Sequence, residues 1–233
     1  MVYDGKGKKL FNVKQRQIKF VFIKQQRKEM EKKFDTIVFD LGGVLIDWNP
    51  AYVYKTIFST EKEMNNFFEQ VCTSDWNEEQ DAGRPLAEAT ELLVKQFPEQ
   101  ETNIRIYYNR WEEMLGGPVE DTVEVFRELR NNANQKIYAL TNWSAETFPI
   151  ALQKYDFLHW FNGRLVSGEE KTRKPFMDIY EKLIERFSIN PHTAIYIDDN
   201  KRNLYPAKEL GMHIIHFNSA QQLRKELQEL QVL

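Results

Sequence analysis

Five polar residues of this sequence each come at the end of a short apolar segment with the composition of a buried strand: Asp40, Thr141, Asn142, Asp198 and Asp199. The carboxyl ends of parallel strands share one edge of a sheet, and ligands of open α/β sheets bind there. We therefore expect residues as far apart in the chain as Asp40 and Asp199 to meet in one crevice.

Three carboxylates in such a crevice would repel one another unless their pKa values rise or a cation neutralises them. Hard oxygen ligands favour Mg²⁺, which proteins commonly bind through one or two carboxylates and a substrate phosphate. Lys174, which precedes Pro175 at a predicted helix start, adds a fixed positive charge. The Thr141 hydroxyl and nearby backbone N–H groups offer donors to phosphate oxygens. These residues predict a magnesium site that binds a phosphate group.

Asp40 is the candidate nucleophile of this set. An aspartate is ionised at neutral pH and can attack phosphorus directly, giving an acyl-phosphate that water later hydrolyses. Because the nucleophile and the substrate are both anions, Mg²⁺ and Lys174 are needed to offset their repulsion and to stabilise the transferring group. The predicted chemistry is phosphoryl transfer through an aspartyl-phosphate.

The apolar segments themselves predict the elements that position these residues. Helical patterns separate the segments, which cover residues 36–39, 137–140, 194–197 and 212–217, with a weaker one at 163–166. Strands that are apolar on both faces and alternate with helices are typical of a parallel sheet covered on both sides. The predicted fold class is α/β, with a Rossmann-like parallel sheet of about five strands.

Residues 50–118 interrupt this alternation. Their apolar residues recur at helical spacing, turn signals separate the groups, and no apolar strand segment occurs among them. We predict a small all-helical cap, inserted after the first strand and lying over the crevice at the sheet edge. Residues 34–49 and 119–233 then form the α/β core.

Residues 1–33 differ in charge from the rest of the chain. They hold eleven Lys or Arg and three acidic residues, whereas the other 200 residues hold 21 basic and 32 acidic ones. We interpret them as a basic, disordered N-terminal extension. The excess of acidic residues in 34–233 argues against nucleic-acid binding. The apolar run of the N-terminal extension is too short to cross a membrane. The single cysteine, Cys72, excludes an intrachain disulfide framework and suits the cytoplasm.

Four segments together resemble the motifs of the haloacid dehalogenase superfamily: FDTIVFDLGGVLID at 34–47, YALTNWS at 138–144, RKP at 173–175 and IYIDDNKRN at 195–203. Each segment is weak alone, but all four occur in order, each after a predicted strand or at a helix start. The resemblance covers residues 35 to about 217. It is closest to capped bacterial sugar-phosphate phosphatases and to the N-terminal phosphatase domain of soluble epoxide hydrolase.

The resemblance implies a metal site at the first and last motifs. Asp40 takes the position of the nucleophile and of a Mg²⁺ ligand. The backbone carbonyl of Gly42 and the side chain of Asp199 take the positions of two further ligands, and Asp198 and Asn203 support them.

The resemblance also implies a phosphate site. Thr141 and Asn142 take the positions that hold the phosphate, and Lys174 takes the position that bridges nucleophile and phosphate. To this set we add Gly43, in the turn after Asp40, and Arg84, whose place in a Gly-Pro turn of the cap leaves it free to face a ligand.

Gly42 departs from the superfamily pattern, because most phosphatases of this group have a second aspartate two residues after the nucleophile. That aspartate protonates the leaving alcohol and then activates water, and such a group contributes about 10²–10⁴-fold to the rate. The sequence therefore predicts a slow phosphatase, a substrate with an easy leaving group such as a sugar 1-phosphate, or a substitute acid. Asp47 is the nearest candidate acid, although it could equally cap a helix that begins near Pro50.

We predict a magnesium-dependent phosphatase whose partner is a small phosphate ester, with sugar phosphates as the expected substrates. A 2-haloacid dehalogenase needs no metal, and Asp198 and Asp199 would repel its anionic substrate. A phosphomutase and a catalytically weak binding or regulatory protein of the same fold remain alternatives. The sequence does not distinguish a monomer from a homodimer.

Overall fold

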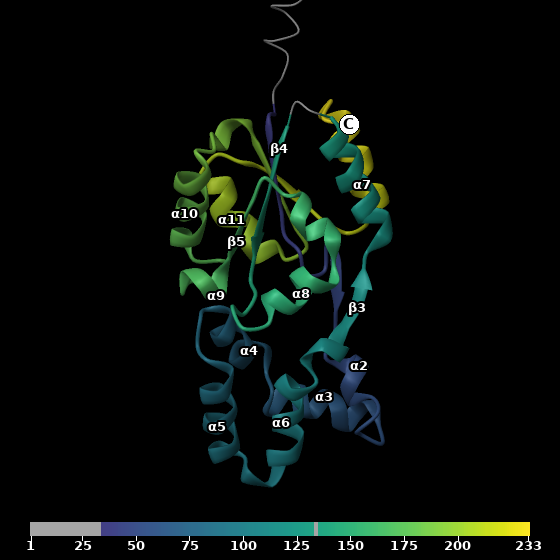
Figure 1. The fold of residues 1–233 in the computed structure, drawn as a ribbon, viewed down its shortest axis with the longest axis vertical. Helices are drawn as coiled ribbons and strands as arrows, with labels where there is room; N and C mark the ends of the chain where they lie inside the picture. The colour runs from purple at the N-terminus through teal and green to yellow at the C-terminus, as the bar shows by residue number, and fades with distance from the viewer. Residues whose placement is uncertain (1–33, 133–134) are drawn as a thin grey trace, which may run out of the picture. The chain divides into compact units, whose positions relative to one another are not determined.

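The computed structural model describes residues 34–132 and 135–233, so the predicted N-terminal extension lies outside the described residues. Within these ranges, parallel strands form a five-stranded sheet in the order β5-β4-β1-β6-β7 (Figure 1). Its strands are β1 (Thr36–Phe39), β4 (Lys136–Thr141), β5 (Gly163–Val166), β6 (Ala194–Asp198) and β7 (His213–His216). The predicted α/β fold class is confirmed.

Helices cover both faces of this sheet (Figure 1). They are α7 (Glu120–Asn131), α8 (Phe148–Lys154), α9 (Ser167–Glu170), α10 (Met177–Phe187), α11 (Lys201–Glu209) and α12 (Ala220–Glu229), with 3₁₀ turns η3 (Asp156–Trp160) and η4 (Pro191–Thr193). Successive side chains of a strand point to opposite faces. Accordingly, Ile37 and Phe39 of β1 pack in a hydrophobic cluster with α7 and α12, whereas Val38 packs in a second cluster with α10 and α11.

The segment after β1 is an insertion built mainly of helices: α2 (Ala51–Tyr54), α3 (Glu61–Gln70), α4 (Ser74–Asp81), α5 (Leu86–Gln96) and α6 (Glu101–Asn109), with 3₁₀ turns η1 (Pro98–Gln100) and η2 (Trp111–Met114). Aromatic contacts organise its interior. The ring of Tyr54 contacts those of Phe58, Phe67, Phe68 and Tyr107. Burial of several rings supplies much of the stabilisation of such a small unit.

Two short strands connect the insertion to the core. In the second of them the sequence Gly116-Gly117-Pro118 is typical of a turn, so a strand was not expected there. β2 (Ile46–Trp48) and β3 (Leu115–Pro118) pair as an antiparallel ribbon. Gly116 permits this pairing, since a Cβ at that position would lie 2.2 Å from the Asp47 carboxylate. Gly117 has a φ of 118°, which a residue with a side chain rarely adopts.

α4 was not predicted, because it lacks the apolar periodicity that marks a helix. Its sequence is SDWNEEQD, and Gln80 is its buried residue. Thr73 caps the helix by accepting a hydrogen bond from the backbone N–H of Trp76 at 3.1 Å. This cap is the local signal from which the helix could have been predicted.

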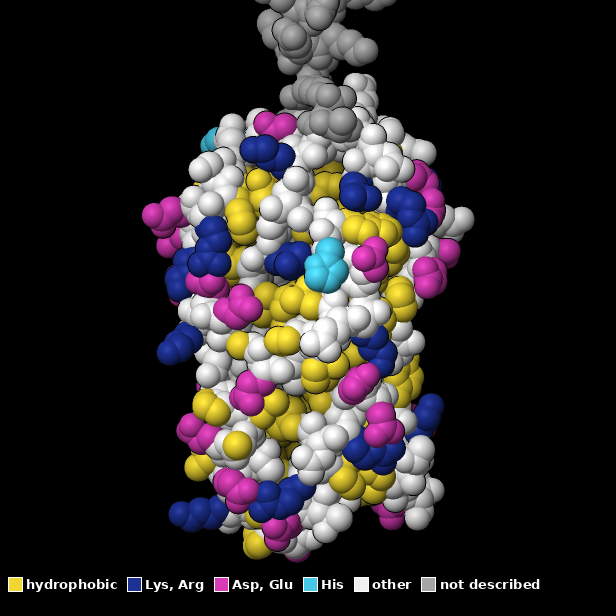
Figure 2. Space-filling model, viewed as in Figure 1, with side chains coloured by type: hydrophobic (Ala, Val, Ile, Leu, Met, Phe, Trp, Pro, Cys, Tyr) yellow, Lys and Arg dark blue, Asp and Glu magenta, His cyan; other side chains and the backbone are white. Residues whose placement is uncertain are grey.

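The surface and helix lengths bear on the partners considered above. Among the described residues, no helix combines the length and apolarity needed to cross a bilayer. Figure 2 shows acidic and basic side chains interspersed over one face of the molecule. That face carries no continuous cationic surface of the kind that nucleic-acid binding requires.

Candidate active site

The carboxyl ends of β1, β4 and β6 bring the predicted site residues together. Phe39 of β1 lies in register with Ile197 of β6 and with Ala139 of β4, so the residues that follow these positions meet at one edge of the sheet. One carboxylate oxygen from each of Asp40, Asp198 and Asp199 lies within 4.8 Å of the others. The crevice expected from the sequence is present.

Lys174 lies at the centre of this cluster. Its Nζ atom lies 2.8 Å from Oδ2 of Asp40 and 2.7 Å from Oδ2 of Asp198, and the residue is fully buried. Burial disfavours the charged ammonium, but Asp198 and Asp40 outweigh this effect and raise the pKa of Lys174 above its ordinary value. Lys174 is therefore a permanent positive charge beside Asp40.

Asp198 is fully occupied by contacts within the protein. Besides Lys174, its carboxylate accepts hydrogen bonds from the Tyr196 hydroxyl at 2.7 Å, the backbone N–H of Asn200 at 2.8 Å and the Asn203 amide at 3.1 Å. Burial alone would raise its pKa, but Lys174 and these hydrogen bonds hold the pKa of Asp198 below its usual range. Asp198 thus positions Lys174 instead of offering a vacant ligand atom.

Asp199 differs from its neighbour, because in the described part of the chain no other side chain hydrogen-bonds to its carboxylate. Burial of the carboxylate, and then Asp198, raise its pKa. The carboxylate packs against Gly43, where an added Cβ would lie 2.4 Å from Oδ2 of Asp199. Gly43 also has a φ of 71°, so both space and backbone conformation require glycine there.

The two predicted phosphate-binding residues at the end of β4 have different environments. Thr141 is buried, and its hydroxyl has no partner among the described residues. The Asn142 side chain binds the main chain of Lys174. Its amide donates to the Lys174 carbonyl at 3.0 Å, and its oxygen accepts from the Lys174 N–H at 2.8 Å. Asn142 therefore fixes the position of the lysine, while Thr141 retains an unused donor.

The donor set fits a hard divalent cation. Three carboxylates face a single lysine, and burial, followed by Asp198 and Asp199, raises the pKa of Asp40 although Lys174 acts in the opposite direction. The available atoms are all oxygens, which suits Mg²⁺ better than a softer metal. A cation between Asp40 and Asp199 would neutralise the excess charge.

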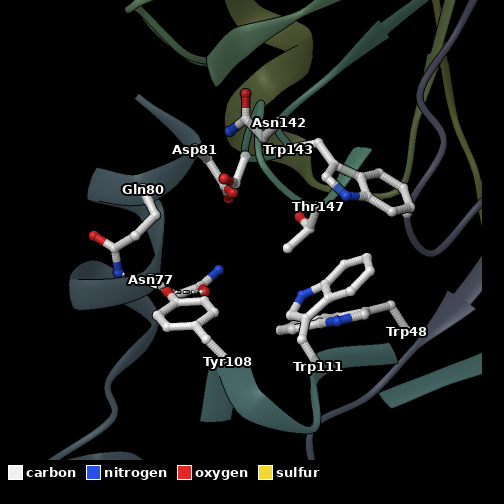
Figure 3. Close-up of a pocket in the computed structure, with 11 residues that line it drawn as sticks. Trp48, Asn77, Gln80, Asp81, Tyr108, Trp111, Asn142, Trp143 and Thr147 are labelled. Atoms are coloured by element: carbon white, nitrogen blue, oxygen red, sulfur yellow. Dashed lines mark hydrogen bonds between the residues drawn. The ribbon is translucent and has the colours of Figure 1, made fainter. Parts of the chain in front are cut away.

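A pocket of about 150 Å³ lies beside the crevice (Figure 3). Aromatic side chains form much of its wall, namely those of Trp48, Tyr108, Trp111 and Trp143. Asp81 and Asn142 line both the pocket and the crevice, so the two cavities are adjacent. A phosphate ester can place its phosphate in the crevice and its leaving group in the pocket.

Two predicted residues have their polar groups engaged elsewhere. The Asp47 carboxylate accepts a hydrogen bond from the Tyr52 hydroxyl. The Arg84 guanidinium donates to Oε1 of Gln80 at 2.7 Å and to the Trp76 carbonyl at 3.0 Å. Neither Asp47 nor Arg84 lines the crevice or the pocket.

Asp81 is a site residue that the sequence reasoning missed. It ends α4, is half-buried, and points its carboxylate into the pocket next to Asn142 (Figure 3). Burial raises the pKa of Asp81 to about 7, against the smaller opposing effects of Arg173, Lys174 and a hydrogen bond from the Ser144 backbone. A carboxyl group with this pKa exchanges a proton near neutral pH.

Comparisons with known proteins agree with this geometry. A family model described as haloacid dehalogenase-like hydrolase matches residues 34–211. The chain is 23% identical to the sesquiterpene phosphatase astK of Aspergillus oryzae over 84% of this chain and 96% of that protein. It is also 23% identical to a phosphorylated carbohydrates phosphatase of Thermotoga maritima, over 78% of this chain and 84% of that protein. Its fold matches that of a haloacid dehalogenase family enzyme of Bacteroides thetaiotaomicron, whose structure was solved in complex with magnesium and inorganic phosphate. That match has a TM-score of 0.58 and 21% sequence identity, and it covers 80% of this chain and 95% of the other. The chain therefore belongs to the haloacid dehalogenase-like hydrolases, as its four motifs had indicated.

Proposed function

We propose that this protein is a magnesium-dependent phosphatase that hydrolyses small phosphate monoesters through an aspartyl-phosphate on Asp40. The observation that carries the proposal is the buried position of Lys174 between Asp40 and Asp198, with the carboxylate of Asp199 beside them. This arrangement offers a nucleophile, a fixed cation and a vacant metal ligand at one point. The phosphatase names of two relatives and the magnesium and phosphate bound by the structural neighbour support it.

Each residue has a defined part in this chemistry. Mg²⁺, held by Asp40, Asp199 and the backbone carbonyl of Gly42, would supply positive charge to the phosphate oxygens. Lys174 offsets the repulsion between the Asp40 carboxylate and the phosphate, and Thr141 donates its unused hydroxyl to a phosphate oxygen. An oxygen of Asp40 attacks phosphorus in line with the leaving oxygen, and water later cleaves the acyl-phosphate.

The pocket favours a sugar phosphate as the substrate. A cavity of about 150 Å³ is large enough for one six-membered ring. Its indole walls suit the apolar face of such a ring. The polar side chains of Asn77, Asp81 and Thr147 also line the pocket, and they can hydrogen-bond to the hydroxyl groups of a sugar, which a hydrocarbon chain lacks.

A phosphate-release screen tests the function. We expect hydrolysis of sugar phosphates with Mg²⁺ and none after chelation, and turnover lower by more than about 10⁴-fold in the Asp40→Asn variant. Acid-quenched wild-type protein should carry labelled phosphate, and the variant should carry none. Wild-type turnover by the variant would exclude Asp40 as the nucleophile, and hydrolysis of isoprenyl phosphates alone would exclude the sugar phosphate.

A haloacid dehalogenase reaction is the competing function on this fold. Its substrate is an anion that would have to approach three carboxylates without a metal, so the acidic cluster disfavours it. Halide release from a 2-haloacid in the presence of a chelator would establish that reaction instead.

A further inference from the structure

We propose that Asp81 is the general acid and base of the reaction, supplied by α4 of the helical insertion in place of the aspartate that the core lacks at position 42. The inference rests on the proposed phosphatase function. It concerns two proton transfers. The leaving oxygen must receive a proton in the first step, and the attacking water must give one up in the second.

The first observation is the open space at Gly42. A Cβ added at this residue would meet no atom within 4 Å, although Gly42 lines both the crevice and the aromatic pocket. A leaving oxygen between phosphate and pocket therefore finds no side-chain proton donor at the end of β1. The donor has to come from another element.

The second observation is that Asp81 lines both of these cavities. Within the described chain, the residues shared by the crevice and the pocket are Gly42, Trp48, Asn77, Asp81 and Asn142. Asp81 is the one among them with a titratable side chain, and its carboxylate points inward (Figure 3). It lies on the boundary between the crevice, which is proposed to hold the phosphate, and the pocket, which is proposed to hold the leaving group.

The third observation is that ion pairs fix α4 over the crevice. Glu78 pairs with Arg173 at 2.9 Å and also with Arg202 of α11. Glu78 and Asp81 are three residues apart, so they lie on the same face of the helix. The contacts of Glu78 therefore also hold Asp81 toward the crevice.

The electrostatic surroundings let Asp81 hold a proton. In the described part of the chain no ion pair involves its carboxylate, since Arg173 is paired with Glu78. The charged or titratable groups that act on it are Arg173, Lys174 and the phenols of Tyr107 and Tyr108 on α6. Burial outweighs the two cations and raises the pKa of Asp81 to about 7, which suits a group that must both donate and accept a proton.

The proton balance of the reaction follows. When Asp40 attacks, the bond from phosphorus to the leaving oxygen breaks, and that oxygen takes the proton of Asp81 and departs as an alcohol. The Asp81 carboxylate then takes a proton from water, whose oxygen bonds to phosphorus as the bond to Asp40 breaks. Inorganic phosphate leaves, Asp40 is again a carboxylate, and Asp81 is again protonated.

The test compares two esters in an Asp81→Asn variant of the full chain, which keeps the shape of the side chain. A hexose 6-phosphate has an alkoxide leaving group that needs a proton, whereas p-nitrophenolate leaves without one. We expect kcat/KM to fall by about 10²–10⁴-fold for the hexose phosphate and by less than about tenfold for p-nitrophenyl phosphate. Asp75→Asn, an exposed change in the same helix, is the control and should leave both rates unchanged.

A second variant guards against a purely structural effect. Gly42→Asp in the Asp81→Asn background returns a carboxyl group to the open space, and it should restore hexose-phosphate hydrolysis at least in part. Equal losses for the two esters, no loss at all, or a selective loss in Asp47→Asn instead would overturn the assignment. A wild-type protein inactive on both esters would overturn the proposed function itself, so the two failures are distinguishable.

Discussion

At the scale of single residues, Gly43 determines the position of the Asp199 carboxylate, which we propose as a metal ligand. Its positive φ and the contact with Asp199 exclude a side chain there, whereas Gly42 next to it has open space around the Cβ position. We expect Gly43→Ala to displace the Asp199 carboxylate and to weaken Mg²⁺ binding by about 10–100-fold, the usual cost of disturbing a residue that positions a ligand.

Calorimetric titration with Mg²⁺ checks this expectation without any turnover. Gly42→Ala is the matched comparison, because it adds the same methyl group one residue earlier, and its effect should be much smaller. Similar Mg²⁺ affinities for the two variants would show that the position of the Asp199 carboxylate does not depend on Gly43.

The site residues divide clearly into those that the sequence predicted and those that it could not. Asp40, Lys174 and Asp199 stand at strand ends or helix starts, where local pattern and topology together determine position. Asp81 belongs to a helix without apolar periodicity, and its role depends on packing between segments distant in the chain. Asp47 was chosen for its nearness in sequence, which does not reveal that Tyr52 binds it.

At the scale of elements, Glu78 connects α4 to the core by two ion pairs. This residue is half-buried and pairs with Arg173 and Arg202, whereas its neighbour Glu79 is exposed and lies 3.7 Å from Arg173. We expect Glu78→Gln to raise KM about three- to tenfold, which corresponds to roughly 1 kcal/mol for partly exposed ion pairs.

Steady-state kinetics at two salt concentrations check the prediction, with Glu79→Gln as the control. Because salt weakens partly exposed ion pairs, the wild-type KM should rise with salt toward that of the Glu78 variant. A KM equal to that of the wild type in Glu78→Gln would show that other contacts hold the helix.

The elements were predicted more completely for the core than for the insertion. All five strands of the sheet lie within or overlap the apolar segments recognised in the sequence. Neither strand of the ribbon of β2 and β3 was predicted. At β3 the Gly-Gly-Pro sequence is typical of a turn. Its pairing depends on the close approach of Asp47 to Gly116, a contact between residues nearly seventy positions apart.

At the scale of the whole molecule, Asp81 links stability to pH. A pKa of about 7 in the folded protein lies above the ordinary value of 3.8, so ionisation of this group costs the folded state free energy. The wild type should lose stability as the pH rises from about 4 to about 7, and Asp81→Asn should not show this contribution.

Thermal denaturation of the wild type and of Asp81→Asn at several pH values tests the direction of this pH dependence. The variant should melt at a higher temperature than the wild type at pH 8, and the difference should shrink toward pH 4. Because Asp81 is only half-buried, solvent screening limits the size of the effect. A variant that is less stable than the wild type at pH 8 would contradict it.

The placement of Glu78 and Asp81 on one helix face has a consequence for the proposed chemistry. Any displacement of α4 that breaks the ion pairs of Glu78 also removes Asp81 from the crevice, because the two residues lie on one face of the same helix. If Asp81 acts as proposed, a protein in that arrangement retains its nucleophile but lacks the group that releases the alcohol and activates water.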